Sequence, residues 1–355
     1  MQTKRRAGTG AGFTVRAVAD MLAGGRAVGT ESTSLPATLD VGVGAIVSTS
    51  GSTGVGKRVV LSRSALLAAA ASSHAAVGTD LTWHLVLPSQ YVAGLMVMVR
   101  SLSAGREPVL SSPDLSDLSA TGDGDAVSIV GTQLYRALGD PIATRALAQF
   151  DLVLVGGAAV PEYLRERAND AGIALRETYG MSETCGGIVW DGHALPGSSF
   201  QLFDDARAPR GGRIALGGPT LCDGYLGDDG VVESATSDGV LVTADWGHME
   251  HGRLVVDGRL DDVVISGGVN VDLGAVRRAV ESIDPHAAVL AVEDPEWGHR
   301  VVLFAATGSL TDWRDRLASD LPRTALPRQL VRVPQVPRTP GGKPDRRALL
   351  ALVPR

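Results

Sequence analysis

Cysteine, aromatic residues and long apolar runs are scarce in this chain of 355 residues, and each scarcity excludes a class of protein. The two cysteines, Cys185 and Cys222, are too few for a disulfide scaffold, and their spacing fits no metal site. Aromatic residues make up 4% and the net charge is −6, which disfavours a nucleic-acid partner. No apolar run approaches the roughly 20 residues that span a bilayer, so we expect no transmembrane segment.

The N-terminal segment also lacks the continuous apolar core of a signal peptide. Lys4, Arg5 and Arg6 are followed by AGTGAGFTVRAVADML, in which polar and charged residues interrupt the apolar ones. Two cysteines without a disulfide framework suit a reducing compartment. We therefore expect a soluble, cytoplasmic protein.

Hydrophobic residues and glycine are plentiful by contrast. A hydrophobic content of 44% supports a large core, and the length favours two domains of unequal size. The 44 glycines exceed the roughly 7% of average usage and follow no collagen-like period. We expect them in turns and in loops that bind ligands.

Strand and helix signals alternate along the first half of the chain. This alternation predicts a parallel sheet covered by helices. The first helix is expected at 13–22, and Ser62 or Ser64 is expected to cap a second, Ala-rich helix. The expected strands are 45–47, 59–61, 83–87, 126–130 and 152–155, and the further helices are 65–76, 92–101, 134–138, 141–149 and 161–171.

The pattern changes twice after residue 195. Short segments with frequent Gly, Asp and Pro between 197 and 256 predict a β-rich subdomain of hairpins. Helices at 273–281 and 310–319 with strands at 287–292 and 300–306 predict a small α+β domain. We expect an α/β protein with residues 1–260 as the N-terminal domain and 261–355 as the C-terminal domain.

A loop of hydroxyl residues and glycine follows the expected strand 45–47. Small residues leave backbone N–H groups free to surround phosphate oxygens, and a lysine adds a point charge. The candidate ATP-binding residues of this loop are Ser48, Thr49, Ser50, Gly51, Ser52, Thr53, Gly54 and Lys57.

A second family of nucleotide-binding proteins shares part of this pattern. Gly51, Gly56 and Lys57 satisfy the start of a P-loop, G-x-x-x-x-G-K. The next residue of a P-loop is Ser or Thr at the start of a helix, whereas Arg58 begins a segment that we expect to be extended. We regard the P-loop NTPase as the weaker interpretation.

Further motif-like segments follow the loop in order. They are LVGGAAVP (154–161), YGMSE (179–183), TAD (243–245), GRLDD (258–262), SGGVNV (266–271), DPEWG (294–298) and PRTPGGKPDR (337–346). In this order they resemble the motifs of the superfamily of acyl-CoA synthetases, luciferases and peptide-synthetase adenylation domains. The chain departs from that pattern with Gly56 for proline, Arg58 for glycine, Ser182 for threonine, Ala244 for glycine and His299 for glutamate.

The resemblance implies a role for each matched residue on the nucleotide side. Gly156, Gly157 and Ala158 would border the adenine, Tyr179 would stack on it, and Gly180 would belong to the same ATP site. Ser182 would meet the α-phosphate and Glu183 would bind Mg²⁺.

The later motifs imply the ribose contacts, the hinge between the domains and the residues that this hinge would move. Asp245 suits the ribose because a carboxylate accepts from both hydroxyls, and the resemblance adds Arg259 at the ribose and phosphate. Asp261 would be the hinge between the domains. Gly267 and Gly268 would form a loop used in the CoA step, and Lys343 would be the catalytic lysine.

These residues imply a two-step ligation that uses ATP, Mg²⁺ and CoA. A carboxylate attacks the α-phosphorus of ATP to form an acyl-AMP and expel pyrophosphate, and cations along the path relieve the charge crowding. A thiol then attacks the acyl-AMP. The small domain would rotate about Asp261, withdrawing Lys343 and bringing in the Gly267–Gly268 loop.

Two segments of the large domain indicate which acid is used. VSIVGTQL (127–134) and YGMSETCGG (179–187), followed by WDG (190–192), resemble the o-succinylbenzoate–CoA ligases of menaquinone biosynthesis, whose short actinobacterial members match this length. Homodimers are common in that branch. Tyr91, Thr132, Gln133 and Gly156 are the candidate substrate-binding residues, although Tyr91 stands where histidine is usual.

Other interpretations of these residues remain open. Thr132 and Gln133 could instead cap the helix 134–138, and Arg100 or Arg136 could add charge at the acid or be surface residues. The runner-up activity is that of another small aryl- or acyl-CoA synthetase. A peptide-synthetase adenylation domain, a P-loop NTPase and a non-catalytic nucleotide-binding relative are further alternatives.

Overall fold

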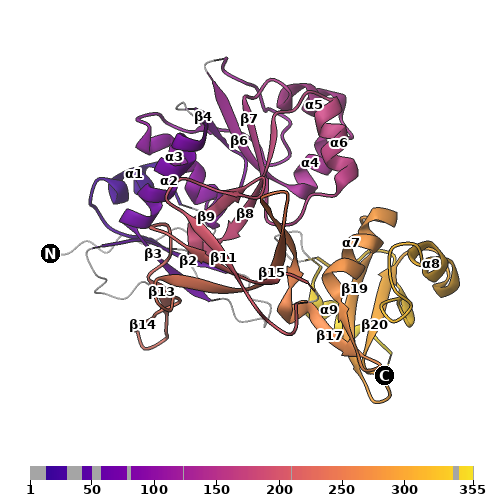
Figure 1. Ribbon diagram of the computed structural model, residues 1–355. Coiled ribbons are helices and arrows are strands. Elements are labelled where there is room, and N and C mark those ends of the chain that lie inside the picture. The colour runs from indigo at the N-terminus through magenta and orange to yellow at the C-terminus, as the bar shows by residue number, and fades with distance from the viewer. Residues whose placement is uncertain are drawn as a thin grey trace. The chain divides into compact units, whose positions relative to one another are not determined.

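A computed structural model describes residues 13–29, 42–49, 57–77, 81–122, 124–208, 210–338 and 344–354 (Figure 1). The chain forms two compact units, each of which draws on separate stretches of sequence. The first unit contains residues 1–201, 215–242 and 251–254. The second contains residues 202–214, 243–250 and 255–355.

The first unit contains a five-stranded sheet in the order β1-β2-β3-β13-β14. Strands β2 and β3 pair antiparallel with Val47 opposite Val59, and β13 adds antiparallel to β3. Every residue of β2 except Ser48 is buried, as expected for a short apolar run bounded by polar loops. The strands are β1 (Val28–Gly29), β2 (Val43–Ser48), β3 (Arg58–Ser62), β13 (Gly224–Leu226) and β14 (Val232–Glu233).

A seven-stranded sheet in the order β10-β9-β8-β7-β6-β4-β5 forms the other layer of strands in this unit. The strands from β8 to β5 pair parallel, and β9 and β10 pair antiparallel at the opposite edge. The strands are β4 (Thr82–Leu85), β5 (Val109–Leu110), β6 (Asp125–Val130), β7 (Leu152–Gly156), β8 (Leu175–Met181), β9 (Gly186–Trp190) and β10 (His193–Ala194).

Helices cover this sheet on both faces. Helices α4, α5 and α6 pack in one apolar core with the side chains of β6 and β7 (Figure 1). Helix α3 is buried from Gly94 to Ser101, and it packs in one core with the first sheet and in another with Trp83 of β4. The helices are α1 (Val15–Leu22), α2 (Arg63–Val77), α3 (Val92–Ser103), α4 (Gly131–Ala137), α5 (Pro141–Leu147) and α6 (Glu162–Asp170).

A four-stranded sheet in the order β11-β12-β15-β16 lies in the stretch predicted to be β-rich. Each of its strands contributes residues to both compact units. The strands are β11 (Ser199–Phe203), β12 (Gly212–Gly217), β15 (Val240–Glu250) and β16 (Arg253–Arg259).

The rest of the second unit is a sheet in the order β18-β17-β20-β19, to which β21 adds alongside β20. Asp272 begins helix α7, because its carboxylate accepts from the N–H of Gly274 at 2.7 Å. The strands are β17 (Val263–Ser266), β18 (Val269–Asp272), β19 (Ala288–Asp294), β20 (Gly298–Ala305) and β21 (Gln329–Arg332), and the helices are α7 (Leu273–Ile283), α8 (Leu310–Leu317) and α9 (Arg346–Ala351).

The predicted α/β class is confirmed, and the local signals located most elements within a few residues. Ser62 is the cap of α2, because its hydroxyl accepts from the N–H of Ala65 at 3.1 Å. Within the described ranges, no helix has the length and apolar content to cross a membrane. A mobile domain that begins at residue 261 stays a prediction.

Candidate active site

The two ends of the expected phosphate loop meet in the structure. The N–H of Thr49 donates to the carbonyl of Lys57 at 2.9 Å, and Ser48 lies opposite Arg58 in the ladder of β2 and β3. The loop is therefore the connection of an antiparallel pair of strands. Residues Ser50 to Gly56, which include the predicted Ser50, Gly51, Ser52, Thr53 and Gly54, lie outside the described residues.

This geometry excludes the P-loop interpretation. A P-loop passes from its lysine directly into a helix, whereas Lys57 enters strand β3. Arg58, where a P-loop has its Mg²⁺-binding hydroxyl, donates through Nε to the carbonyl of Leu226 at 3.1 Å and pairs with Asp228 at 2.7 Å.

Ser182 and Glu183 lie on a single 3₁₀ turn, η1 (Ser182–Thr184), that follows β8. The hydroxyl of Thr184 fixes this turn, because it accepts from the N–H of Met181 at 2.9 Å and donates to the carbonyl of Gly186 at 2.7 Å. Cys185 then adopts a left-handed conformation at φ +54° and ends the turn. The turn holds the hydroxyl and the carboxylate on adjacent residues.

Glu183 and Lys57 contact the same side chain, that of Tyr225 in β13. The phenol donates to Glu183 Oε1 at 2.9 Å. Lys57 Nζ lies 4.3 Å from the centroid of the ring. Two predicted residues that are far apart in sequence thus contact one tyrosine, Lys57 at its ring and Glu183 at its hydroxyl.

The carboxyl ends of four neighbouring parallel strands bring further predicted residues to one edge of the seven-stranded sheet. Tyr91 follows β4, Thr132 follows β6, Gly157 follows β7, and Tyr179 lies near the end of β8. This is the edge at which open α/β sheets bind ligands. Tyr91, Thr132 and the loop residues Gly157 and Ala158 are exposed there.

Gly156 and Gly180 are also required by close packing. A Cβ at Gly156 would lie 2.6 Å from Thr178 Oγ1, and one at Gly180 would lie 2.0 Å from the carbonyl oxygen of Gly186. The Thr178 side chain and the Gly186 backbone therefore occupy the space that a larger residue would need at these positions.

Gln133 is a helix cap in the structure. Its Oε1 accepts from the N–H of Val130 at 3.0 Å, and its Nε2 donates to the carbonyl of Pro113 at 2.7 Å. The capping interpretation is thus confirmed for Gln133. Its role at the substrate stays a prediction, as do those of Tyr91, Thr132 and Gly156.

The two arginines considered at the acid differ in their surroundings. Arg136 is exposed, as expected for a surface residue. For Arg100 the surface interpretation is wrong: the side chain is 5% exposed, donates to Ser73 Oγ at 3.0 Å and stacks on Trp83 at 4.8 Å. Burial lowers the pKa of Arg100 to about 10. Arg100 is buried because residues Gly94 to Ser101 of α3 are buried on every side of the helix. The neighbouring sequence alone does not reveal this, because the covering residues belong to other elements.

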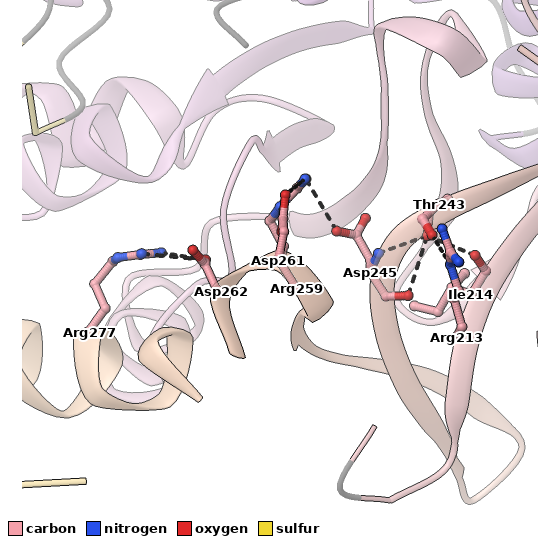
Figure 2. Close-up of polar contacts among 8 residues, drawn as sticks. All are labelled: Arg213, Ile214, Thr243, Asp245, Arg259, Asp261, Asp262 and Arg277. Atoms are coloured by element: carbon pink, nitrogen blue, oxygen red, sulfur yellow. Dashed lines mark hydrogen bonds and ion pairs between the residues drawn. The ribbon is translucent and has the colours of Figure 1, made fainter. Parts of the chain in front are cut away.

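In the second unit, Asp245 lies on strand β15, where the side chain of Thr243 holds its backbone (Figure 2). The Thr243 hydroxyl donates to the carbonyl of Ile214 at 2.7 Å and accepts from the N–H of Asp245 at 3.0 Å. The Nε of Arg213 donates to the carbonyl of Thr243. This threonine therefore aims the carboxylate that we expect to bind the ribose.

Arg259 lies between two carboxylates (Figure 2). Its Nε and Nη2 bind both oxygens of Asp261 at 2.7 Å, and its Nη1 lies 3.5 Å from Asp245. The Asp261 hydrogen bond raises the pKa of Arg259. Burial opposes ionisation of Asp261, but Arg259 outweighs it and holds the Asp261 pKa below its usual range. Asp261, the predicted hinge residue, thus forms a bidentate ion pair with Arg259, the arginine predicted at the ribose.

The loop expected to serve the CoA step has two left-handed glycines. Gly267 and Gly268 have φ of +59° and +78°. The N–H of Gly267 donates to the carbonyl of Trp297 at 2.9 Å, and Arg328 covers that ring at 3.5 Å from its centroid. The DPEWG turn therefore supports this loop. Lys343 lies outside the described residues.

The residues on the phosphate side fit a Mg²⁺ ion. Within the described ranges, Glu183 Oε1 accepts from Tyr225 and Oε2 makes no hydrogen bond or ion pair, so a carboxylate oxygen remains for a metal. Mg²⁺ takes oxygen ligands and is commonly held by one or two carboxylates together with substrate phosphates.

Sequence reasoning did not identify Tyr225, Thr184 or Thr243. Thr184 and Thr243 lie inside motifs given above, where their hydroxyls fix the 3₁₀ turn that carries Glu183 and the strand backbone that carries Asp245. Tyr225 carries no local signal beyond the Gly224-Tyr225 pair, because its function depends on a strand pairing between distant segments.

Comparison with known proteins agrees with this geometry. Residues 43–226 match the family described as AMP-binding enzyme. A probable 2-succinylbenzoate–CoA ligase of Mycobacterium tuberculosis is 38% identical over 91% of this chain and 90% of its own length. A 2-succinylbenzoate–CoA ligase of Salmonella typhimurium is 32% identical over 85% of this chain and 67% of its own length.

A solved structure gives the same result for the fold. The o-succinylbenzoate CoA synthetase of Bacillus subtilis, in complex with the acyl-adenylate intermediate OSB-AMP, superposes with a TM-score of 0.75 at 25% identity, covering 86% of this chain and 68% of the other. The chain therefore belongs to the family of AMP-binding enzymes that includes the 2-succinylbenzoate–CoA ligases.

Proposed function

We propose that this protein is an AMP-forming acid–thiol ligase that adenylates o-succinylbenzoate and transfers the acyl group to CoA, as a step of menaquinone biosynthesis. The similarity to ligases named for this acid supports the choice of substrate. The observation that carries the adenylation is the convergence of Lys57 and Glu183 on Tyr225. It places a cation and a metal-binding carboxylate together beside the closed loop, as a polyphosphate requires.

In the first half-reaction, a carboxylate oxygen of the acid forms a bond to the α-phosphorus of ATP. The bond between the α-phosphorus and the oxygen that bridges to the β-phosphorus breaks, and pyrophosphate leaves. The barrier arises from crowded negative charge, which preorganised cations and donors lower. Lys57 and the loop bind the β- and γ-phosphates, Ser182 meets the α-phosphate, and Lys343 bridges the attacking carboxylate and the α-phosphate.

Glu183 is the residue that would hold Mg²⁺, through its free oxygen. When bound, the ion neutralises charge on the phosphates and leaves pyrophosphate a better leaving group. The protein's own part is to present that oxygen in a fixed direction from the η1 turn.

On the ribose side, Asp245 accepts from the ribose hydroxyls and Arg259 lies within reach of the same group. Asp245 is 7% exposed, and a buried carboxylate that gains two donors binds more tightly than one in water. Tyr179 and the Gly156–Ala158 loop bind the adenine.

In the second half-reaction, the thiol of CoA attacks the acyl carbon and AMP leaves. Lys343 would obstruct this path, so the C-terminal domain rotates about Asp261 and presents the Gly267–Gly268 loop. The Asp261–Arg259 ion pair is solvent-accessible, with side-chain exposures of 42% and 47%, so breaking it costs little.

The acid is a dicarboxylate on an aromatic ring, and its unreacted carboxylate needs hydrogen-bond donors. The hydroxyls of Tyr91 and Thr132 are exposed at the sheet edge described above. Gln133 supports that edge through its hydrogen bonds to the backbone of Val130 and Pro113.

The test is a panel of acids assayed for CoA-dependent release of AMP and pyrophosphate. We expect o-succinylbenzoate to give the highest kcat/KM and an acyl-CoA detectable by mass spectrometry. Higher values for benzoates or fatty acids would instead assign another aryl- or acyl-CoA synthetase. Release of ADP and phosphate would contradict the adenylation itself.

A further inference from the structure

Tyr225 contacts two residues of the proposed ATP site without belonging to any motif that predicted the site. Its hydroxyl donates to Glu183 Oε1 at 2.9 Å, and the face of its ring lies 4.3 Å from Lys57 Nζ. A carboxylate oxygen can only accept this hydrogen bond, so the phenol is the donor.

The backbone of Tyr225 is fixed by the strand that leaves the phosphate loop. Tyr225 lies opposite Val59 in the antiparallel ladder of β13 and β3. Gly224 has a φ of +151°, and a Cβ there would lie 2.0 Å from the carbonyl oxygen of Glu233. Glycine at 224 thus permits the close pairing that places the tyrosine.

The backbone of Glu183 is held by the same segment. The N–H of Cys222 donates to the carbonyl of Glu183 at 2.8 Å, three residues before the tyrosine that binds its carboxylate. Main chain and side chain of Glu183 are therefore both bound by residues 222–225. Such double anchoring restricts the rotamers of a side chain that would otherwise turn freely.

We propose that Tyr225 is a positioning residue that orients the Glu183 carboxylate for Mg²⁺ and holds the Lys57 ammonium at the phosphate side. One carboxylate oxygen is used by the phenol, so the other is directed to the ion. The cation–π contact confines the lysine, which otherwise has four rotatable bonds. The inference rests on the proposed adenylation and deepens it, and it does not depend on which acid is used.

The alternative is that Tyr225 only fills the core. Its ring does pack against the apolar cluster that includes Val59 and Met96. A packing role depends on the ring and not on the hydroxyl, so the two roles separate on removal of a single oxygen atom.

The experiment compares Tyr225→Phe and Tyr225→Leu, with Tyr135→Phe as control because Tyr135 is exposed on α4. ATP binding is measured by calorimetry across a Mg²⁺ titration, together with the melting temperature. A hydrogen bond to a charged group is worth about tenfold in affinity or more. We expect Tyr225→Phe to weaken the apparent Mg²⁺ affinity about tenfold and to leave Mg²⁺-free ATP binding unchanged.

Tyr225→Leu should weaken ATP binding also without Mg²⁺, because Lys57 loses the ring. The lysines of the chain are Lys4, Lys57 and Lys343, so acetylation of each can be followed by mass spectrometry. We expect Lys57 to react several-fold faster in Tyr225→Leu, with the rate at Lys4 unchanged.

The proposal is overturned if Tyr225→Phe matches the parent at every Mg²⁺ concentration, or if its losses follow only a lowered melting temperature. These readouts use ATP, Mg²⁺ and an acetylating reagent, without the acid or CoA. If the parent protein fails to ligate o-succinylbenzoate but Tyr225→Phe still weakens the Mg²⁺ dependence of ATP binding, the result counts against the proposed substrate and not against the role of Tyr225.

Discussion

The two compact units hold their proposed nucleotide-binding side chains by different means. In the first unit, Lys57 and Glu183 are anchored by strand ladders, backbone hydrogen bonds and one neutral phenol. In the second, Arg259 is held by a bidentate, solvent-accessible ion pair to Asp261. Backbone ladders resist rearrangement, whereas exposed ion pairs contribute about 0–1 kcal/mol each and exchange readily.

This difference suits the two half-reactions. In the proposed mechanism, Lys57 and Glu183 keep one arrangement, so rigid anchoring is no disadvantage. The proposed rotation about Asp261 would change the conformation of its region between the steps, so weak contacts that can re-form are an advantage. The comparison predicts that changes in the second unit separate the half-reactions more than changes in the first.

The largest effect is expected from Lys343→Ala. Loss of a charge that acts on the transition state costs about 10²- to 10³-fold in rate. Formation of acyl-AMP should fall by that factor, while thioester formation from preformed acyl-AMP should be largely spared. Both half-reactions are measured separately, with Lys4→Ala as the matched lysine control. An equal loss of both steps would contradict the role of Lys343.

Asp245→Ala should weaken ATP binding about 10- to 100-fold, because a charged acceptor of ribose hydrogen bonds is lost. The bidentate Arg259–Asp261 pair should remain, so we expect the local fold to be kept. Calorimetry with ATP and with pyrophosphate measures this. A similar loss for pyrophosphate, which has no ribose, would rule out the ribose contact.

Asp261→Pro should impair mainly the thioester step, by about tenfold or more, because proline restricts both its own φ and the residue before it. Asp261→Ala is the matched control, since it removes the ion pair to Arg259 but leaves the backbone free. We expect the alanine variant to retain most of the second step. Stopped-flow measurement of each half-reaction decides the point, and a normal second step in Asp261→Pro would exclude the hinge.

Gly267→Ala and Gly268→Ala test the loop against its neighbour Trp297. Both glycines have positive φ, so each alanine costs about 1–2 kcal/mol. A Cβ at 267 would also lie 2.7 Å from the Trp297 ring, whereas at 268 no atom lies within 4 Å. The KM for CoA should therefore rise several-fold more in Gly267→Ala, with adenylation unchanged in both. Equal KM values for CoA in the two variants would show that the contact with Trp297 does not affect the loop.

The smallest effect concerns the pH dependence of the Arg259–Asp261 pair. Because the folded pKa of Asp261 lies below its usual range, the pair stabilises the fold above about pH 4 and the contribution is lost as the pH falls further. Asp261→Asn should lower the melting temperature slightly near neutral pH, and the difference should vanish in acid. A difference that persists below pH 3 would have another cause.

Local signals were sufficient for most helices and strands. The apolar runs at β2 and β3 and the Ser62 cap of α2 depend on neighbours within a few residues, so they can be read directly. The ordered motifs also identified the family. Arg100 was misjudged because its burial depends on Trp83 and Ser73, which lie in other elements.

The candidate site divides in the same way. Glu183, Asp245 and Arg259 could be named as candidates because side-chain chemistry and motif order are properties of the sequence, and their roles stay predictions. Their partners were not: Tyr225 reaches Glu183 only because β13 pairs with β3, and nothing near residue 225 encodes that pairing.

The amino-acid sequence by itself determined that this chain alternates strands and helices, carries an ordered set of nucleotide-binding motifs and places lysine at only a few positions, two of which are Lys57 and Lys343. The tertiary structure decided that the phosphate loop joins antiparallel strands, that Gln133 is a cap, and that Tyr225 links Lys57 to Glu183. The physical reason is range: propensity and patterning act over one or two turns of chain, whereas these contacts depend on long-range pairing of strands and packing of helices.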